Sequence, residues 1–146
     1  LRSFMSFIES ASIILRHGSH FFLIQRSRDS RYWPHYWGFP GGKKEDDEDI
    51  FDAAKRELQE ETGVSVDACD IISLITIEAH YIDGVRKNTL YLFDNWGGAP
   101  ENLESKIHSD TGWFTLEDLP YPMIPHVKEG FFALLDGKQN LIYNGI

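Results

Sequence analysis

The stretch from Gly42 to Val64, GKKEDDEDIFDAAKRELQEETGV, constrains the fold more than any other part of this 146-residue chain. It follows directly on Gly41, passes through an acidic loop and then takes on helical periodicity. We predict that a helix begins near Asp49, because this aspartate and those at 46 and 47 can accept hydrogen bonds from free backbone N–H groups and suit the positive end of the helix dipole. The helix is expected to end at Gly63, which readily adopts the left-handed cap conformation.

The predicted helix has one apolar and one polar face. At about 100° per residue, Ile50, Ala54 and Leu58 form a single apolar stripe, with Phe51 at its edge. The opposite face carries Asp52, Lys55 and Gln59, which are expected to point to water.

Three glutamates lie on the border of the apolar stripe. Glu57, Glu60 and Glu61 stand at positions i, i+3 and i+4, so their carboxylates converge. Carboxylates on a helix are usually a solvated surface, and a lone Glu-x-x-Glu-Glu is compatible with that. Like charges this close repel, however, and a hard divalent cation such as Mg²⁺ relieves the repulsion, because it takes oxygen ligands and keeps water and substrate phosphate in its remaining positions. Arg56, one turn before Glu60, is predicted to hold that carboxylate in place.

The spacing of the whole stretch is more specific than the three glutamates alone. After Gly42 come five residues and Glu48, then seven residues and the run Arg56-Glu57-Leu58-x-Glu60-Glu61-x-Gly63-Val64. This pattern resembles the Nudix box of the nucleoside-diphosphate-linked hydrolases, with every defining position filled, and the preceding segment WGFPGG also matches the family. The resemblance implies an α/β (α+β) fold, a three-layer α/β/α sandwich with a mixed sheet. It also implies an enzyme that cleaves a pyrophosphate linkage with Mg²⁺ or Mn²⁺.

Composition limits the class of protein. The length predicts one domain over residues 1–146. A net charge of −9 argues against non-specific nucleic-acid binding, which rests on Lys/Arg patches, although a metal can still bridge the protein to phosphate. No apolar run is long enough for a membrane span. A single cysteine, Cys69, forbids an internal disulfide and favours a cytoplasmic location. Monomer and homodimer both remain open.

The rest of the chain predicts hairpins and a second helix. Apolar runs predict a strand over 5–16 and its return over 21–24, both buried on two faces. Further expected elements are strands over 71–82 and 85–96 joined at Asp83-Gly84, a loop over 101–110, a short strand at 113–114, a helix over 123–135 and a tail strand within 140–146. Two helices far apart among hairpins agree with the three-layer arrangement.

The resemblance assigns roles within and near the box. It implies metal ligands at Glu57, Glu60 and Glu61, with the Gly41 carbonyl as a further candidate. The general base that takes the water proton is expected to be Glu57, with Glu61 next. Arg56 would orient these groups.

Two positions outside this set complete the metal prediction. Glu48 is expected to stabilise the loop before the helix. Many relatives carry another carboxylate after the sheet, and Glu104 stands at that place, with Glu101 as its rival. Either is also compatible with a plain surface acid.

A basic, aromatic loop before the box suggests the substrate-binding residues. Arg26, Arg28 and Arg31 suit phosphate oxygens, and the flat side chain of Trp33 suits a nucleobase. The alternative is that the arginines are surface residues and the tryptophans core residues, an alternative that we favour for Trp37.

The predicted substrate is a (deoxy)nucleoside triphosphate, cleaved to the monophosphate and pyrophosphate. The segment LPYPMIP resembles the base-facing segment of mutator-type (MutT-like) relatives, but has Met123 where some of them carry a purine-reading asparagine, which weakens the expectation of an oxidised guanine. Tyr81 keeps a dinucleoside polyphosphate open, and a nucleotide sugar is a further alternative. A non-catalytic nucleotide sensor is the alternative of a different class, although such domains typically have a degenerate box.

Overall fold

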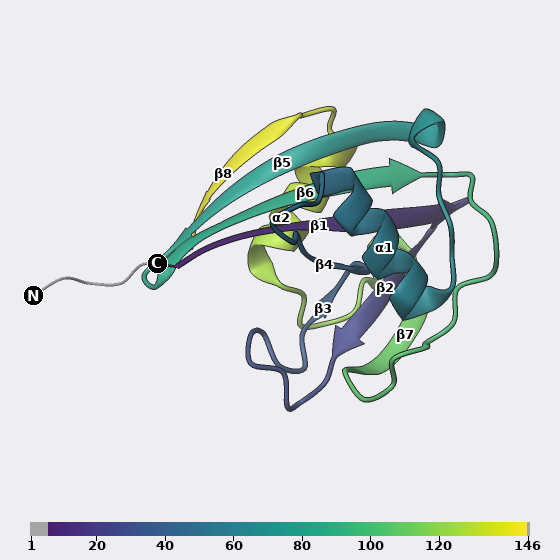
Figure 1. Cartoon of the computed structure of the whole chain (residues 1–146), viewed down its shortest axis with the longest axis horizontal. Coiled ribbons are helices and arrows are strands. Elements are labelled where there is room, and N and C mark those ends of the chain that lie inside the picture. The colour runs from purple at the N-terminus through teal and green to yellow at the C-terminus, as the bar shows by residue number, and fades with distance from the viewer. Residues whose placement is uncertain (1–5, 146) are drawn as a thin grey trace, which may run out of the picture.

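A mixed sheet with a helix on each face forms the body of the computed structural model, which describes residues 6–145 (Figure 1). The helices are α1 (Ile50–Thr62) and α2 (Pro125–Leu135), with 3₁₀ turns at Ala68–Asp70 and Leu116–Asp118. The strands are β1 (Ser6–His17), β2 (His20–Arg26), β3 (Trp37–Gly38), β4 (Gly41–Lys43), β5 (Ile71–Tyr81), β6 (Gly84–Phe93), β7 (His108–Phe114) and β8 (Asn140–Asn144).

Strand pairing gives the sheet its mixed character. The main order is β3-β2-β1-β6-β5-β8, while β4 pairs with β1 and β7 pairs with β2. The β1/β6 and β5/β8 pairs are parallel, and the remaining pairs are antiparallel. The predicted mixed sheet is therefore confirmed.

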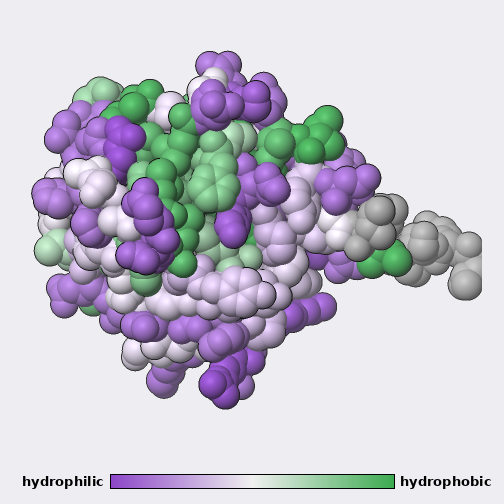
Figure 2. Space-filling view, turned by 180° about the vertical axis from the view of Figure 1, so that it is seen from behind, coloured by the Kyte–Doolittle hydropathy of each residue, from purple (hydrophilic) through white to green (hydrophobic). Residues whose placement is uncertain are grey.

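Each helix covers one face of this sheet. Ala54 and Leu58 of α1 pack in one apolar cluster with β1, β2 and β6, and Val127 and Phe131 of α2 pack in a second cluster with β5 and β6. In Figure 1 α1 lies in front of the strands and α2 behind them. Figure 2 shows the rear face, where apolar surface forms a band flanked by hydrophilic side chains. The predicted α/β/α layering is confirmed. Among the described helices none has the length and apolar character to cross a membrane.

The ends of α1 follow the sequence prediction, with one correction. Asp49 is the N-cap and its carbonyl accepts the N–H of Ala53 at 3.0 Å. Gly63 closes the helix at φ 79° and donates its N–H to Gln59. The expected side-chain caps are absent, because no hydrogen bond joins the carboxylates of Asp46, Asp47 or Asp49 to a backbone N–H within residues 6–145. In this loop it is the Glu48 carboxylate that accepts a backbone N–H, that of Glu45 at 3.0 Å.

Three other expected boundaries were wrong, and the first is the end of β6, which lies at Phe93 and not at Trp96. α2 begins at Pro125 and not at Met123, because the residue before a proline avoids the helical conformation and proline itself suits the first helical position. The segment expected to be a loop over 101–110 already enters β7 at His108. The end of that strand was predicted at 113–114, but its start was missed because its first residues are polar, and only His108 among them is buried.

Candidate active site

A cleft of about 880 Å³ opens between β1, β4, β6, the loop after β2 and the first turn of α2. Its walls hold two groups of side chains. The first, the carboxylate group, comprises Gly41, Gly42, Arg56, Glu57, Glu61 and His108. The second, the aromatic group, comprises Tyr32, Trp33, Arg86, Asn88 and His126. Both groups line the same cavity.

Helix α1 sets the depth of the three predicted carboxylates. Glu57 and Glu61 line the cleft, with side chains 18 % and 4 % exposed, whereas Glu60 is 51 % exposed and is not part of the cleft wall. Arg56 contacts both Glu57 and Glu60, at 3.4 and 3.3 Å from its Nη1. The structure therefore brings Glu57 and Glu61 into the cleft and leaves Glu60 at its rim.

Glu61 is a buried carboxylate. Its Oε1 accepts the N–H of Gly41 at 2.9 Å, which joins α1 to β4. Burial raises the pKa of Glu61 well above its usual range, and repulsion from Glu57 and Glu104 adds to the rise. A carboxylate in such a place is costly to ionise without a nearby cation.

Glu57 lies against the backbone of the second glycine. A Cβ on Gly42 would come within 2.5 Å of the Glu57 Cδ, so only glycine leaves room for this carboxylate. Burial raises the pKa of Glu57, and the neighbouring charge of Arg56 opposes that rise. The carboxylate is thus held at the cleft wall by a helix on one side and by β4 on the other.

Arg56 is fixed by the loop that precedes α1. Its Nε and Nη2 donate to the two oxygens of Glu48 at 2.6 and 3.0 Å. The hydrogen bond from Arg56 lowers the pKa of Glu48 to about 2, with help from the Glu45 N–H, and the same bond raises the pKa of Arg56. This bidentate pair is tighter than the Arg56–Glu60 contact that the sequence suggested.

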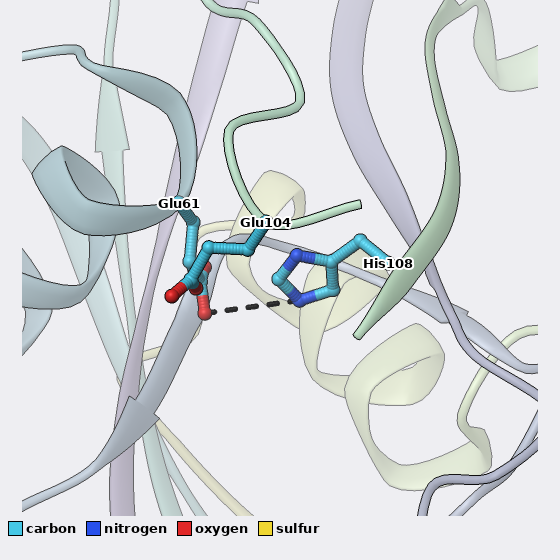
Figure 3. A group of neighbouring side chains, drawn as sticks. All are labelled: Glu61, Glu104 and His108. Carbon is cyan, nitrogen blue, oxygen red and sulfur yellow. Dashed lines mark ion pairs between the residues drawn. The ribbon is translucent and has the colours of Figure 1, made fainter. Parts of the chain in front are cut away.

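The loop between β6 and β7 adds a further carboxylate. Glu104 is half-buried, and its carboxylate meets Glu61 and His108, with one potential ligand atom from each residue within 4.8 Å of the others (Figure 3). Glu101 is exposed, does not line the cleft, and its N–H bonds to the carbonyl of Thr62. Of the two rivals, only Glu104 lies beside the box carboxylates.

The predicted substrate residues are split by the fold. Arg26 lines the cleft, donates to the carbonyl of Tyr32 at 2.8 Å, and has its pKa lowered by burial. Trp33 also lines the cleft and packs edge-on against Tyr81, with ring centroids 5.6 Å apart. Arg28 and Arg31 are exposed and lie outside the cleft wall.

Trp37 and Met123 both lie in the core. Trp37 is buried in the core, in line with the core alternative that we favoured. Met123 is also buried, forms a backbone bridge to Trp37 and does not line the cleft. Within the segment LPYPMIP it is Ile124 that lines the cleft, and His126 and Val127, which follow the segment, line it as well.

Comparison with known proteins agrees with this geometry. The NUDIX domain family model matches residues 7–135. The chain belongs to the Nudix family. It is a pyrophosphohydrolase of the Nudix type.

The similar proteins include enzymes and a solved structure. Over 98 residues the chain is 34% identical to the 8-oxo-dGTP diphosphatase of Buchnera aphidicola subsp. Acyrthosiphon pisum, which covers 66% of this chain and 76% of that protein. Over 87 residues it is 33% identical to the oxidized purine nucleoside triphosphate hydrolase of Mus musculus, covering 58% of this chain and 53% of the mouse protein. The crystal structure of the MutT Nudix hydrolase from Burkholderia pseudomallei superposes with a TM-score of 0.74 at 25% identity, covering 87% of this chain and 97% of that one.

Three polar residues of this Nudix cleft were missed by sequence reasoning. His108 was hidden in the expected loop. Asn88, 7 % exposed, lies between Lys87 and Thr89 of β6, and its Oδ1 has no hydrogen-bond partner within residues 6–145; an amide at the start of the buried half of a strand was the available signal. His126 shares a 2.8 Å hydrogen bond with the Tyr81 hydroxyl, and its pKa is lowered to about 4 by burial and by Arg86.

Proposed function

We propose that this protein hydrolyses a (deoxy)nucleoside triphosphate to the monophosphate and pyrophosphate, in a reaction that depends on Mg²⁺ or Mn²⁺. The observation that carries the proposal is that one cleft of about 880 Å³ holds both the carboxylate group and the aromatic group. That volume falls within the usual range for a small-molecule site. A single nucleotide can thus contact aromatic side chains with its base and carboxylates, through a metal, with its phosphates.

The residues present fit a divalent cation. Glu57 and Glu61, which line the cleft, and Glu104, which lies beside Glu61, would hold it, with Glu60 at the rim and the Gly41 carbonyl as further oxygen donors. Burial and neighbouring carboxylates raise the pKa values of Glu57 and Glu61, so a doubly charged ion would stabilise both in their ionised form. Such an ion shields phosphate charge and lowers the pKa of bound water.

Protein groups supply the remaining chemistry. In our proposal the Glu57 carboxylate takes the proton of the attacking water, with Glu61 as the second candidate. Arg56, anchored on Glu48, keeps the Glu57 carboxylate in position through its 3.4 Å contact. Arg26 is the arginine of the basic loop that lines the cleft, so it is the one proposed to bind phosphate oxygens.

The aromatic group is proposed to bind the base. Trp33 and Tyr32 offer flat apolar surfaces for stacking. Asn88 offers an amide without a partner for its Oδ1, which suits a base edge that presents a donor beside an acceptor. The Buchnera relative, an 8-oxo-dGTP diphosphatase, and the mouse relative, an oxidized purine nucleoside triphosphate hydrolase, support a triphosphate substrate. They also make an oxidised purine the first base to test.

The alternatives have less support. Tyr81, the residue that favoured a dinucleoside polyphosphate, does not line the cleft, and its hydroxyl is bonded to His126. A non-catalytic sensor does not need two neighbouring carboxylates with raised pKa values. Glu57 and Glu61 form such a pair.

A nucleotide panel tests the proposal. The protein is incubated with Mg²⁺ and, in turn, 8-oxo-dGTP, the eight common triphosphates, diadenosine tetraphosphate and ADP-ribose, and products are identified by mass. We expect monophosphate and pyrophosphate from a triphosphate, and no turnover in excess chelator. A kcat/KM more than about tenfold higher for diadenosine tetraphosphate or ADP-ribose, about 1.4 kcal/mol in transition-state binding, would overturn the substrate proposal. Full turnover in chelator would overturn the metal dependence.

A further inference from the structure

His108 is a buried histidine whose ring makes no hydrogen bond within residues 6–145. Its side chain is 6 % exposed and lines the cleft. Its Nε2 is 3.8 Å from the Glu61 Oε2, which is too long for a hydrogen bond. Buried polar groups normally have a partner. A ring that faces the cleft can bind water or a ligand that enters it, and the direction of the imidazole calls for an explanation in those terms.

The surroundings of Nε2 supply one. Figure 3 shows the imidazole directed at the carboxylates of Glu61 and Glu104, and the three potential ligand atoms lie within 4.8 Å of one another. Ligand atoms about 2.1 Å from a common ion lie about 3.0 Å apart when adjacent in an octahedral shell and about 4.2 Å apart when opposite. The 3.8 Å spacing between Nε2 and Oε2 exceeds the adjacent value by about 0.8 Å, so a small rotation of the two side chains brings both atoms onto one ion.

The backbone holds His108 in this place. Its N–H donates to the carbonyl of Glu104 at 2.9 Å, so the two residues belong to one turn. Its carbonyl accepts the side-chain amide of Asn102 at 2.8 Å. Pairing with Arg26 then fixes it as the first residue of β7. The main chain of His108 is thus fixed by hydrogen bonds, and its ring lies beside the carboxylate of Glu104, which belongs to the same turn.

We propose that the Nε2 of His108 is a ligand of a divalent cation that Glu61 and Glu104 also bind. The inference rests on the proposed metal dependence and adds to it a nitrogen donor. An all-oxygen set suits Mg²⁺, whereas imidazole suits the later transition metals. The site therefore binds Mn²⁺ through one nitrogen, and it favours Co²⁺ over Mg²⁺ more strongly than carboxylates alone would.

Spectroscopy of bound Mn²⁺ tests the ligand directly, without turnover. The full chain is loaded with Mn²⁺ and measured by electron spin-echo envelope modulation, which detects nitrogen bound to the ion. We expect ¹⁴N modulation in the wild type, its change to the ¹⁵N pattern after selective ¹⁵N-histidine labelling, and its loss in His108→Gln. The matched controls are His126→Gln, which changes another histidine of the cleft wall, and His20→Gln, which changes an exposed one. Both should keep the signal.

Metal affinities give an independent readout. By calorimetry we expect His108→Gln to lower the affinity for Co²⁺ by about tenfold or more and the affinity for Mg²⁺ by less than about threefold. If His108→Gln does not fold, His108→Asn and the ¹⁵N-histidine measurement on the wild type replace it. Bound Mn²⁺ without histidine modulation would overturn the role of His108 and leave the proposed function intact. A wild type that binds no Mn²⁺ would overturn both.

Discussion

Replacing Gly42 with alanine tests how the fold positions Glu57. The added Cβ would lie 2.5 Å from the Glu57 Cδ and 2.6 Å from its Oε2, whereas carbon atoms in ordinary contact are about 3.5 Å apart. The carboxylate must therefore retreat by about 1 Å. Displacement of a catalytic group by that distance costs about 100-fold in rate, or about 2.7 kcal/mol of transition-state stabilisation.

The same substitution should leave the fold intact. Gly42 is not one of the glycines in the left-handed region, and the group that must yield is the end of a flexible side chain. We expect the free energy of unfolding to change by less than about 1 kcal/mol. Gly41→Ala is the matched contrast, because its Cβ would collide with the backbone carbonyl of Ala11 and lie 2.6 Å from the Ser12 Cα. Backbone cannot yield as a side chain can, so that variant should be strongly destabilised.

Single-turnover kinetics on 8-oxo-dGTP, or on the best triphosphate of the panel, measure the loss, and urea denaturation measures stability. A double-mutant cycle isolates the cause. Because Gly42 acts only through Glu57, Gly42→Ala combined with Glu57→Gln should be no slower than Glu57→Gln alone. Wild-type kcat in Gly42→Ala, or fully additive losses in the double variant, would refute the reasoning.

Three further predictions follow from the structure. Glu57→Gln should lower kcat by about 10²–10⁴-fold in steady-state assays, whereas Glu45→Gln, in the exposed loop, should stay near wild type; equal losses would contradict the assignment. Gly130→Ala should reduce the free energy of unfolding by about 1–3 kcal/mol, because its Cβ would lie 2.6 Å from the Ile77 Cγ1; an unchanged urea midpoint would contradict this. Burial lowers the pKa of His126 to about 4, below the value near 6.5 of a free imidazole. The unfolded chain therefore binds the proton first as pH falls. The stability contributed by this group is complete above about pH 6.5 and declines towards pH 4, by up to about 3 kcal/mol. Urea midpoints at pH 7.5 and 5.0 measure the decline, and His126→Gln should make it shallower.

The parts of the fold that were predictable have local causes. The ends of α1 follow from Asp49 and Gly63, because capping is decided within one turn of the chain. Burial of β1 on both faces follows from its continuous apolar run, which ends at Leu15. The start of β7 could not be read in the same way, since its polar residues carry no alternation and its partner β2 lies more than eighty residues earlier.

The residues of the candidate site were likewise predictable only where their positions have local causes. Glu57 and Glu61 could be named because four residues of one helix fix their spacing. Which of Glu101 and Glu104 approaches Glu61 depends on how the loop before β7 closes, and the sequence left both open. The cleft residues that are hardest to foresee, His108 and Asn88, reach it from strands whose register is set by partners far away in the chain.

The catalytic residues and the base-binding residues of this cleft come from different segments of the chain. The box supplies its carboxylates from one continuous segment, which also carries Ala54 and Leu58, the residues that pack α1 on the sheet. Asn88 and Trp33 reach the cleft from β6 and from the loop after β2, and within residues 6–145 no hydrogen bond joins either side chain to a box carboxylate. Substitutions at these two positions should therefore alter the preferred base while leaving the pyrophosphate chemistry unchanged.

Asn88→Ala tests this directly. It should change the ratio of kcat/KM between two bases by about tenfold, which is the effect of losing one hydrogen-bonded base edge. The limiting kcat for each base should stay near wild type. An equal fall of kcat for every base would instead place Asn88 with the catalytic residues.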